Sequence, residues 1–94
     1  MTEPQDTPQE LKTTFENALN QIKTDSSLAS PSNEVKLKMY AFYKQATQGD
    51  VSGKKPGMTD FVGKAKYAAW EKLAGTSAAD AMQGYLELFE SLKP

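Results

Sequence analysis

Tyr40, Tyr43 and Lys44 lie close together in the middle of this chain, at positions i, i+3 and i+4. In a helix, side chains at this spacing share one face. Flat aromatic rings beside a positive charge suit a ligand that combines an aromatic base with a phosphate group. Each tyrosine taken alone is more simply a half-buried core residue with a hydrated hydroxyl. Together with Lys44, the two tyrosines predict a platform for base stacking and phosphate binding.

Lys66 has an unusual position for a lysine. In the helix predicted around it, the apolar face consists of Val62, Ala65, Ala69, Trp70 and Leu73. The pattern places Lys66 in the middle of that face, where an ammonium needs an anion, a path to water or a shifted pKa. Two interpretations remain open. Either the side chain extends along the surface to water, or it binds a ligand phosphate, with Lys44 as the second cation.

Two further side chains are weaker candidates for the same site. Tyr85 lies in the centre of the apolar stripe of the last predicted helix. A core tyrosine and a ligand contact are about equally consistent with that position. Lys23 flanks the apolar stripe of the first predicted helix, and on its own it is most simply an exposed lysine.

Four segments with helical periodicity must position these side chains, and no strand-like alternation stands out. We expect helices from Pro8 to the turn at Asp25–Ser27, from Asn33 to Gln48, from Met58 or Thr59 to Leu73, and from Ala78 to Leu92. A capping box that begins at Thr7 starts the first helix, Asn33 is the expected N-cap of the second, and Gly49 ends it. Short helices joined by short loops predict an all-α fold, a compact four-helix bundle.

The apolar positions of three of these helices define the expected core. They are Leu11, Phe15, Ala18, Leu19 and Ile22 in the first helix, Val35, Met39, Phe42 and Ala46 in the second, and Ala81, Met82, Tyr85, Leu88, Phe89 and Leu92 in the last. On the second helix this aliphatic ridge is separate from the ridge that carries the tyrosines and Lys44.

Composition excludes several classes of function. The chain has no cysteine and no histidine, so disulfides, thiolate chemistry and the commonest metal ligands are absent, and we expect no metal and no cofactor. Residues 34–72 hold eight lysines against four acids in a chain of net charge −1, which suits a small anion. Nucleic acid calls for a larger basic surface, so we expect no nucleic-acid partner.

The remaining composition bears on organisation and location. Ninety-four residues make one domain over 1–94, in which we expect residues 1–6 to be disordered. Residues 1–6 are polar and acidic, unlike a secretory signal, and no apolar run approaches the length of a membrane span. We therefore expect a monomeric, cytoplasmic protein without stable membrane insertion.

The sequence around these residues resembles the acyl-CoA-binding protein family. The shared pattern is YxxYKQATxGD from Tyr40 to Asp50, then PGMxDFxGKAK from Pro56 to Lys66, then Trp70. The resemblance extends over roughly Phe15 to Leu92. A string of this length with constant spacing is far more specific than a short glycine motif.

Members of this family are four-helix bundles with an open ligand site, and they carry and buffer medium- and long-chain acyl-CoA esters without being enzymes. The resemblance implies that Tyr40, Tyr43 and Lys44 contact the adenine and the 3′-phosphate. It implies that Lys66 also reaches the 3′-phosphate, and it adds Tyr85 and Lys23 to the acyl-CoA site. Acyl-CoA would then be the ligand, with no cofactor.

The chain departs from the family pattern at several places. Val62 stands where many members carry a lysine, and Tyr67 replaces a frequent tryptophan. The first loop, residues 25–33, is about two residues longer than in common members and lacks a basic residue. Because this loop borders the acyl channel in the family, we expect the differences to affect acyl-length preference more than binding of the CoA head.

Two other classes of function compete with a carrier. A helical protein–protein interaction module without a nucleotide ligand would use the tyrosine face to dock a partner. An enzyme that acts on acyl-CoA, such as a thioesterase, would need a nucleophile or a base near the thioester. Without histidine or cysteine the chain offers poor candidates, and we expect it not to be an enzyme.

Overall fold

Helices account for all the regular secondary structure in residues 8–94, the part of the chain that the computed structural model describes. The helices are α1 (Pro8–Thr24), α2 (Asn33–Gln48), α3 (Phe61–Glu71) and α4 (Ala78–Ser91). The predicted all-α fold of four helices is confirmed. The expected capping residue Thr7 and the expected disorder of residues 1–6 lie outside the described residues.

Side-chain caps set the starts of three helices. Ser32 precedes α2 and its hydroxyl accepts a hydrogen bond from the Val35 amide at 3.2 Å, so the prediction of Asn33 as the N-cap is wrong by one residue. Asp60 accepts from the Gly63 amide at 2.9 Å, and α3 therefore begins after the turn that Met58 and Thr59 form. Ser77 caps α4 in the same way.

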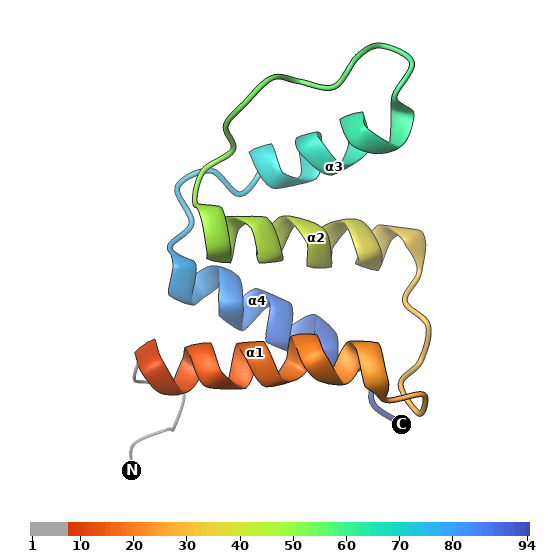
Figure 1. The fold of residues 1–94 in the computed structure, drawn as a ribbon, viewed down its shortest axis with the longest axis vertical. Coiled ribbons are helices and arrows are strands. Elements are labelled where there is room, and N and C mark those ends of the chain that lie inside the picture. Colours follow the sequence, from red (N-terminus) through yellow and green to blue (C-terminus); the bar gives the residue numbers. More distant parts are fainter. Residues whose placement is uncertain (1–7) are drawn as a thin grey trace.

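The helices lie side by side in the order α3, α2, α4, α1 (Figure 1). The antiparallel pair α2 and α4 forms the centre, α3 packs against α2, and α1 packs against α4. Gly49 ends α2 with a positive φ of 82°, which glycine adopts without strain. The long loop that follows returns across the molecule, so α3 runs in the same direction as α2 (Figure 1).

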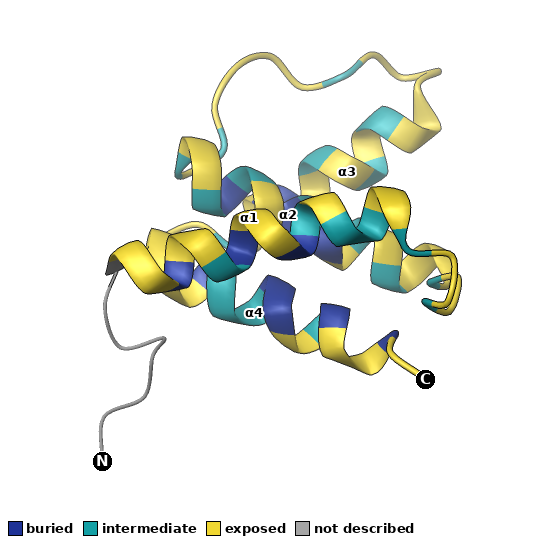
Figure 2. Ribbon diagram, turned by 60° about the horizontal axis from the view of Figure 1, so that its bottom comes forward, coloured by how far each residue is buried: buried dark blue, intermediate teal, exposed yellow. Residues whose placement is uncertain are grey.

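The core lies between α1, α2 and α4. Its buried side chains are Leu11, Phe15, Ala18, Met39, Tyr85, Leu86, Phe89 and Leu92. The periodicity predicted all of these except Leu86. Figure 2 shows the buried segments on these three helices, whereas most of α3 is intermediate or exposed. In α3 only Trp70 is buried and Val62 is 66% exposed, so the predicted apolar face of that helix is wrong at Val62.

A group of hydrogen bonds holds the end of α2 against the loop between α3 and α4. The buried Gln45 amide donates from Nε2 to Asp50 Oδ1 and to the Thr76 carbonyl, both at 2.8 Å. Asp50 Oδ1 also accepts from the Gly75 amide at 2.8 Å. The Trp70 indole donates to the Gly49 carbonyl at 2.8 Å. These contacts, which we call the Asp50 network, fix where α3 lies along α2.

Candidate functional site

Tyr40 on α2 and Lys66 on α3 face each other. The Lys66 ammonium lies 5.3 Å from the centre of the Tyr40 ring. Lys66 is exposed, so the prediction that it projects from the middle of a buried apolar face is wrong. The physical reason is that α3 packs on α2 alone, which buries only a narrow strip around Trp70. Lys66, one turn before Trp70, lies at the open edge of that strip.

Lys44 lies against a second aromatic ring. Its ammonium is 4.9 Å from the centre of the Trp70 ring, and its side chain is half-buried. The sequence placed Trp70 on the apolar face of its predicted helix, and its burial agrees with that, but the pairing with Lys44 was missed. No local spacing could have revealed it, because the two residues belong to different helices that the Asp50 network holds together.

Phe15 joins Tyr43 and Tyr85 into an aromatic cluster between α1, α2 and α4. The Phe15 ring is stacked on Tyr43, with centroids 6.4 Å apart, and meets Tyr85 edge-on at 5.2 Å. Tyr85 is buried, whereas Tyr43 is 38% exposed. Burial, and after it the nearby Tyr43 hydroxyl, raises the pKa of Tyr85 above its ordinary value. Tyr85 therefore stays neutral near pH 7, whereas Tyr43 keeps an exposed ring.

The site carries positive charge without a compensating carboxylate. In residues 8–94 the ion pairs are Lys38–Glu34 and Lys93–Glu90, and neither Lys44 nor Lys66 takes part in one. Lys23 is exposed near the end of α1, and it too forms no ion pair within the described residues. An ammonium held against an aromatic ring remains available to a stronger anionic ligand.

A hollow of about 440 Å³ lies beside this surface, between the end of α1, the loop after it, α2 and α4. Its lining includes the apolar side chains of Ile22, Leu28, Met39 and Leu92 together with Tyr85 and Lys36. Lys36 precedes Tyr40 by one helical turn, so it continues the ridge of Tyr40 and Lys44. The polar surface with the tyrosines and an apolar hollow are thus adjacent.

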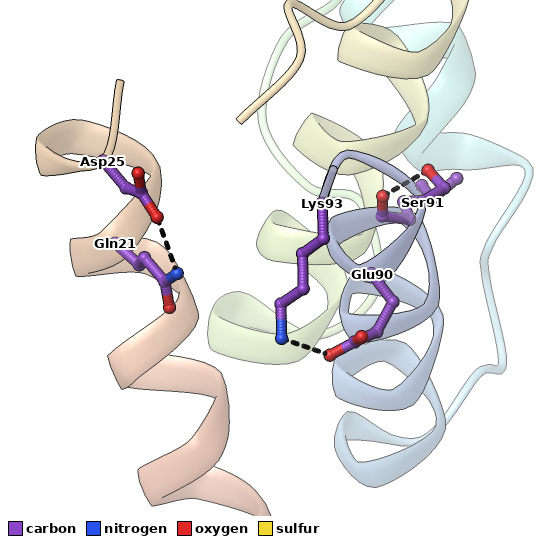
Figure 3. Close-up of polar contacts among 6 residues, drawn as sticks. Gln21, Asp25, Glu90, Ser91 and Lys93 are labelled. Atoms are coloured by element: carbon purple, nitrogen blue, oxygen red, sulfur yellow. Dashed lines mark hydrogen bonds and ion pairs between the residues drawn. The ribbon is translucent and has the colours of Figure 1, made fainter. Parts of the chain in front are cut away.

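Local hydrogen bonds shape the wall of this hollow. Gln21 donates to Asp25 Oδ2 at 3.0 Å at the end of α1 (Figure 3). Asp25 Oδ1 accepts from the Ser27 hydroxyl and the Ser27 amide. The bonds from the Ser27 hydroxyl, Gln21 and the Ser27 amide, in that order, lower the pKa of Asp25. The Ala29 amide donates to the Leu92 carbonyl at 2.8 Å, which ties the loop to the end of α4.

A larger hollow, of about 720 Å³, lies between α2, α3 and α4 on another face of α2. Ala41, Phe42, Ala69, Leu73 and Leu88 are among its lining residues. None of the six predicted site residues lines it. The smaller hollow is therefore the one that adjoins the predicted ligand residues, although it is the less spacious of the two.

Comparison with known families assigns the chain. The sequence profile of the family described as "Acyl CoA binding protein" matches residues 12–89. The chain belongs to the acyl-CoA-binding protein family. The fold agrees, since the crystal structure of Oryza sativa acyl-CoA-binding protein 2 matches with a TM-score of 0.78 and 36% identity, covering 87% of this chain and 89% of that one.

Relatives of this family differ greatly in length. "Acyl-CoA-binding protein homolog 1" of Caenorhabditis elegans is 45% identical over 78 residues, which is 83% of this chain and 88% of the relative. "Enoyl-CoA delta isomerase 2" of Rattus norvegicus is 50% identical over 78 residues, but the match spans only 19% of that protein. The chain thus corresponds to about a fifth of the isomerase and to most of the shorter relative.

The described residues add two observations. Among residues 8–94 no helix combines the length and the hydropathy needed to cross a membrane. The same residues contain no cluster of three or more acidic side chains that could hold a metal ion.

Proposed function

We propose that this protein binds medium- and long-chain acyl-CoA esters without covalent chemistry, and that it buffers and transports them. One observation carries the proposal. Two ammonium groups, those of Lys44 and Lys66, lie on aromatic rings without a carboxylate partner in the described chain, next to an apolar hollow. Acyl-CoA combines a base, phosphates and an apolar chain, which match the aromatic rings, the ammonium groups and the apolar hollow.

The head of the ligand would bind on the ridge formed by Tyr40, Tyr43 and Lys44, with Lys66 on the facing helix. An ammonium–ring contact at an exposed site contributes about 0.5–1 kcal/mol. A hydrogen bond between charged groups contributes about 1.5–3 kcal/mol, so a phosphate can displace the rings as the partner of both lysines. Lys23 and Tyr85 complete the proposed set, Lys23 as a further cation and Tyr85 through its hydroxyl.

The acyl chain would lie in the smaller hollow, shielded from water by the end of α1 and the loop after it. Burial of each methylene contributes about 0.8 kcal/mol, so affinity should rise with chain length until the hollow is full. The closed loop geometry around Asp25 and Ala29 sets that limit.

The proposal includes a monomeric carrier in the cytoplasm that catalyses no reaction on its ligand. The sequence supports the last point, since it has neither histidine nor cysteine to activate an attack on a thioester. An interaction module without a nucleotide ligand is not favoured, because the family to which the chain belongs is one of acyl-CoA-binding proteins.

Calorimetric titration tests the binding proposal. Hexadecanoyl-CoA should bind more tightly than free CoA, and hexadecanoate should bind poorly. Equal affinity for CoA and its ester would contradict the role of the hollow, and tight binding of the fatty acid alone would contradict the role of the lysines. Incubation with hexadecanoyl-CoA, followed by a thiol assay, separates a carrier from a thioesterase, because an enzyme releases free CoA.

A further inference from the structure

The turn before α3 and the first residues of α3 expose three large apolar side chains. Met58 is 85% exposed, Phe61 76% and Val62 66%. Tyr43 is the other large hydrophobic residue exposed in the described part of the chain, and it belongs to the proposed ligand site. A soluble surface rarely gathers large apolar side chains in one place without a function. These three residues are not explained by the fold or by the ligand.

Lysines flank these side chains in the sequence. Lys54, Lys55 and Lys64 are exposed, and none of them forms an ion pair within residues 8–94. The acid among them, Asp60, uses its Oδ1 to cap α3 through the Gly63 amide. We call the six residues, Met58, Phe61, Val62 and these three lysines, the α3 tip. It is apolar and basic in a chain of net charge −1.

The shape of the α3 tip suits an extended surface better than a second protein. It lies at the outer end of the long loop and α3, on the far side of α2 from α1 (Figure 1). Its apolar side chains are largely exposed, and none of its six residues lines either of the two hollows. Exposed apolar side chains with exposed lysines on both sides in the sequence match the boundary between acyl chains and anionic headgroups.

We propose that the α3 tip docks the protein reversibly on anionic phospholipid bilayers. Met58, Phe61 and Val62 enter the headgroup region, and the lysines contact acidic headgroups. Lys66 follows Phe61 by five residues, about 7.5 Å along the helix, so a docked molecule holds its proposed ligand site next to the bilayer. That last consequence rests on the proposed function, whereas docking itself rests on the α3 tip alone.

Vesicle co-sedimentation of the ligand-free protein tests the docking. Vesicles with equal parts of phosphatidylcholine and phosphatidylserine should bind the protein at low salt, and vesicles of phosphatidylcholine alone should bind it far less. A lysine near an anionic surface is worth about a fivefold change in partitioning, so Lys54→Gln with Lys55→Gln should weaken binding about twenty-five-fold. The matched control is Lys12→Gln with Lys72→Gln, which removes two exposed lysines that form no ion pair within residues 8–94, from α1 and from the C-terminal end of α3, and should have little effect.

The apolar side chains of the α3 tip can be tested separately from its lysines. Phe61→Ser with Val62→Ser should reduce partitioning about tenfold, because both side chains lose the apolar surface that leaves water. Brominated phospholipids should quench part of the tryptophan fluorescence of a Phe61→Trp variant, because the indole at position 61 enters the headgroup region. They should not quench the fluorescence of the unsubstituted protein, whose tryptophan, Trp70, is buried. Absence of binding to the mixed vesicles, or unchanged binding of both double variants, overturns the proposal. Because no acyl-CoA is present, neither result bears on the proposed ligand.

Discussion

The ammonium of Lys66 and the ring of Tyr40 lie 5.3 Å apart although they belong to different helices. Their proximity depends on the position of α3 along α2, since α3 has no other helix to pack on. The Asp50 network, which includes the Trp70–Gly49 hydrogen bond, sets that position. The proposed cation site is therefore assembled by contacts at the C-terminal end of α3 and in the loop after it.

Lys66→Met separates a ligand lysine from a structural one. Lys66 is exposed and forms no ion pair in residues 8–94, so the free energy of unfolding should change by less than about 1 kcal/mol, the worth of an exposed ammonium–ring contact. Binding of hexadecanoyl-CoA should weaken by about 1.5–3 kcal/mol and become less sensitive to salt, because one charge pair is lost. Chemical denaturation and calorimetry at two salt concentrations measure both effects.

Lys64→Met is the matched control for that experiment. Lys64 is exposed on the same helix, two residues away, and takes part in none of the ammonium–ring contacts of residues 8–94. Its removal should leave ligand affinity nearly unchanged at physiological salt, where exposed charges are screened. A Lys66→Met protein that unfolds, but whose folded fraction binds normally, would show that Lys66 is structural.

Lys44→Ala should act through the 3′-phosphate of the ligand. We expect a loss of about 1.5–3 kcal/mol in binding of hexadecanoyl-CoA, the range for hydrogen bonds to charged groups. The loss should shrink for the ester of dephospho-CoA, which lacks that phosphate. Titration of both ligands with both proteins gives the coupling free energy between Lys44 and the 3′-phosphate directly. Equal losses with the two ligands would mean that Lys44 does not bind the 3′-phosphate.

Much of this arrangement is predictable from local sequence. Apolar periodicity predicts α1, α2 and α4 well, because each of these helices buries one face in a shared core. It fails for α3, where a single buried residue, Trp70, leaves Val62 in water and Lys66 at an edge. A pattern of apolar residues does not reveal how many helices will cover it.

In the candidate site, too, some contacts follow from local sequence and others arise only from tertiary packing. The ridge of Tyr40, Tyr43 and Lys44 follows from helical spacing alone. The contacts of Lys44 with Trp70 and of Phe15 with Tyr85 join distant parts of the chain, and tertiary packing alone creates them. The resemblance to a family supplied Lys66, Tyr85 and Lys23, for which spacing left the structural interpretation open. Their roles in binding stay predictions.

Gly84→Ala should destabilise the central helix pair. A Cβ at Gly84 would lie 2.4 Å from Cε1 of the Phe42 ring, so α2 and α4 must separate or the ring must move. Overpacking of this kind costs about 1–3 kcal/mol in the free energy of unfolding. Gly57→Ala is the control, since a Cβ there meets nothing within 4 Å. Urea denaturation of the two variants should show the loss at Gly84 only, and an unchanged midpoint for Gly84→Ala would contradict the close packing.

Asp50→Asn should weaken both folding and the cation site in a pH-dependent manner. The Gly75 amide, and after it the Gln45 side chain, lowers the pKa of Asp50 below its ordinary value. The folded state thus favours the charged carboxylate, so its contribution to stability is present above the ordinary pKa of about 3.9 and is lost as the pH falls through the lower folded value. The variant should be less stable than the unsubstituted protein at pH 7, and the difference should vanish in acid.

Thermal denaturation across this pH range measures the effect, with Glu71→Gln as the control because that exposed carboxylate accepts no hydrogen bond in the described structure. A stability difference that persists unchanged in acid would show that Asp50 acts through its shape and not its charge.

At pH 7 the Asp50→Asn variant should also bind hexadecanoyl-CoA more weakly, although Asp50 lies outside the proposed ligand contacts. Loosening the loop at Gly75 frees α3 to shift along α2, and Lys66 then spends less time beside Tyr40.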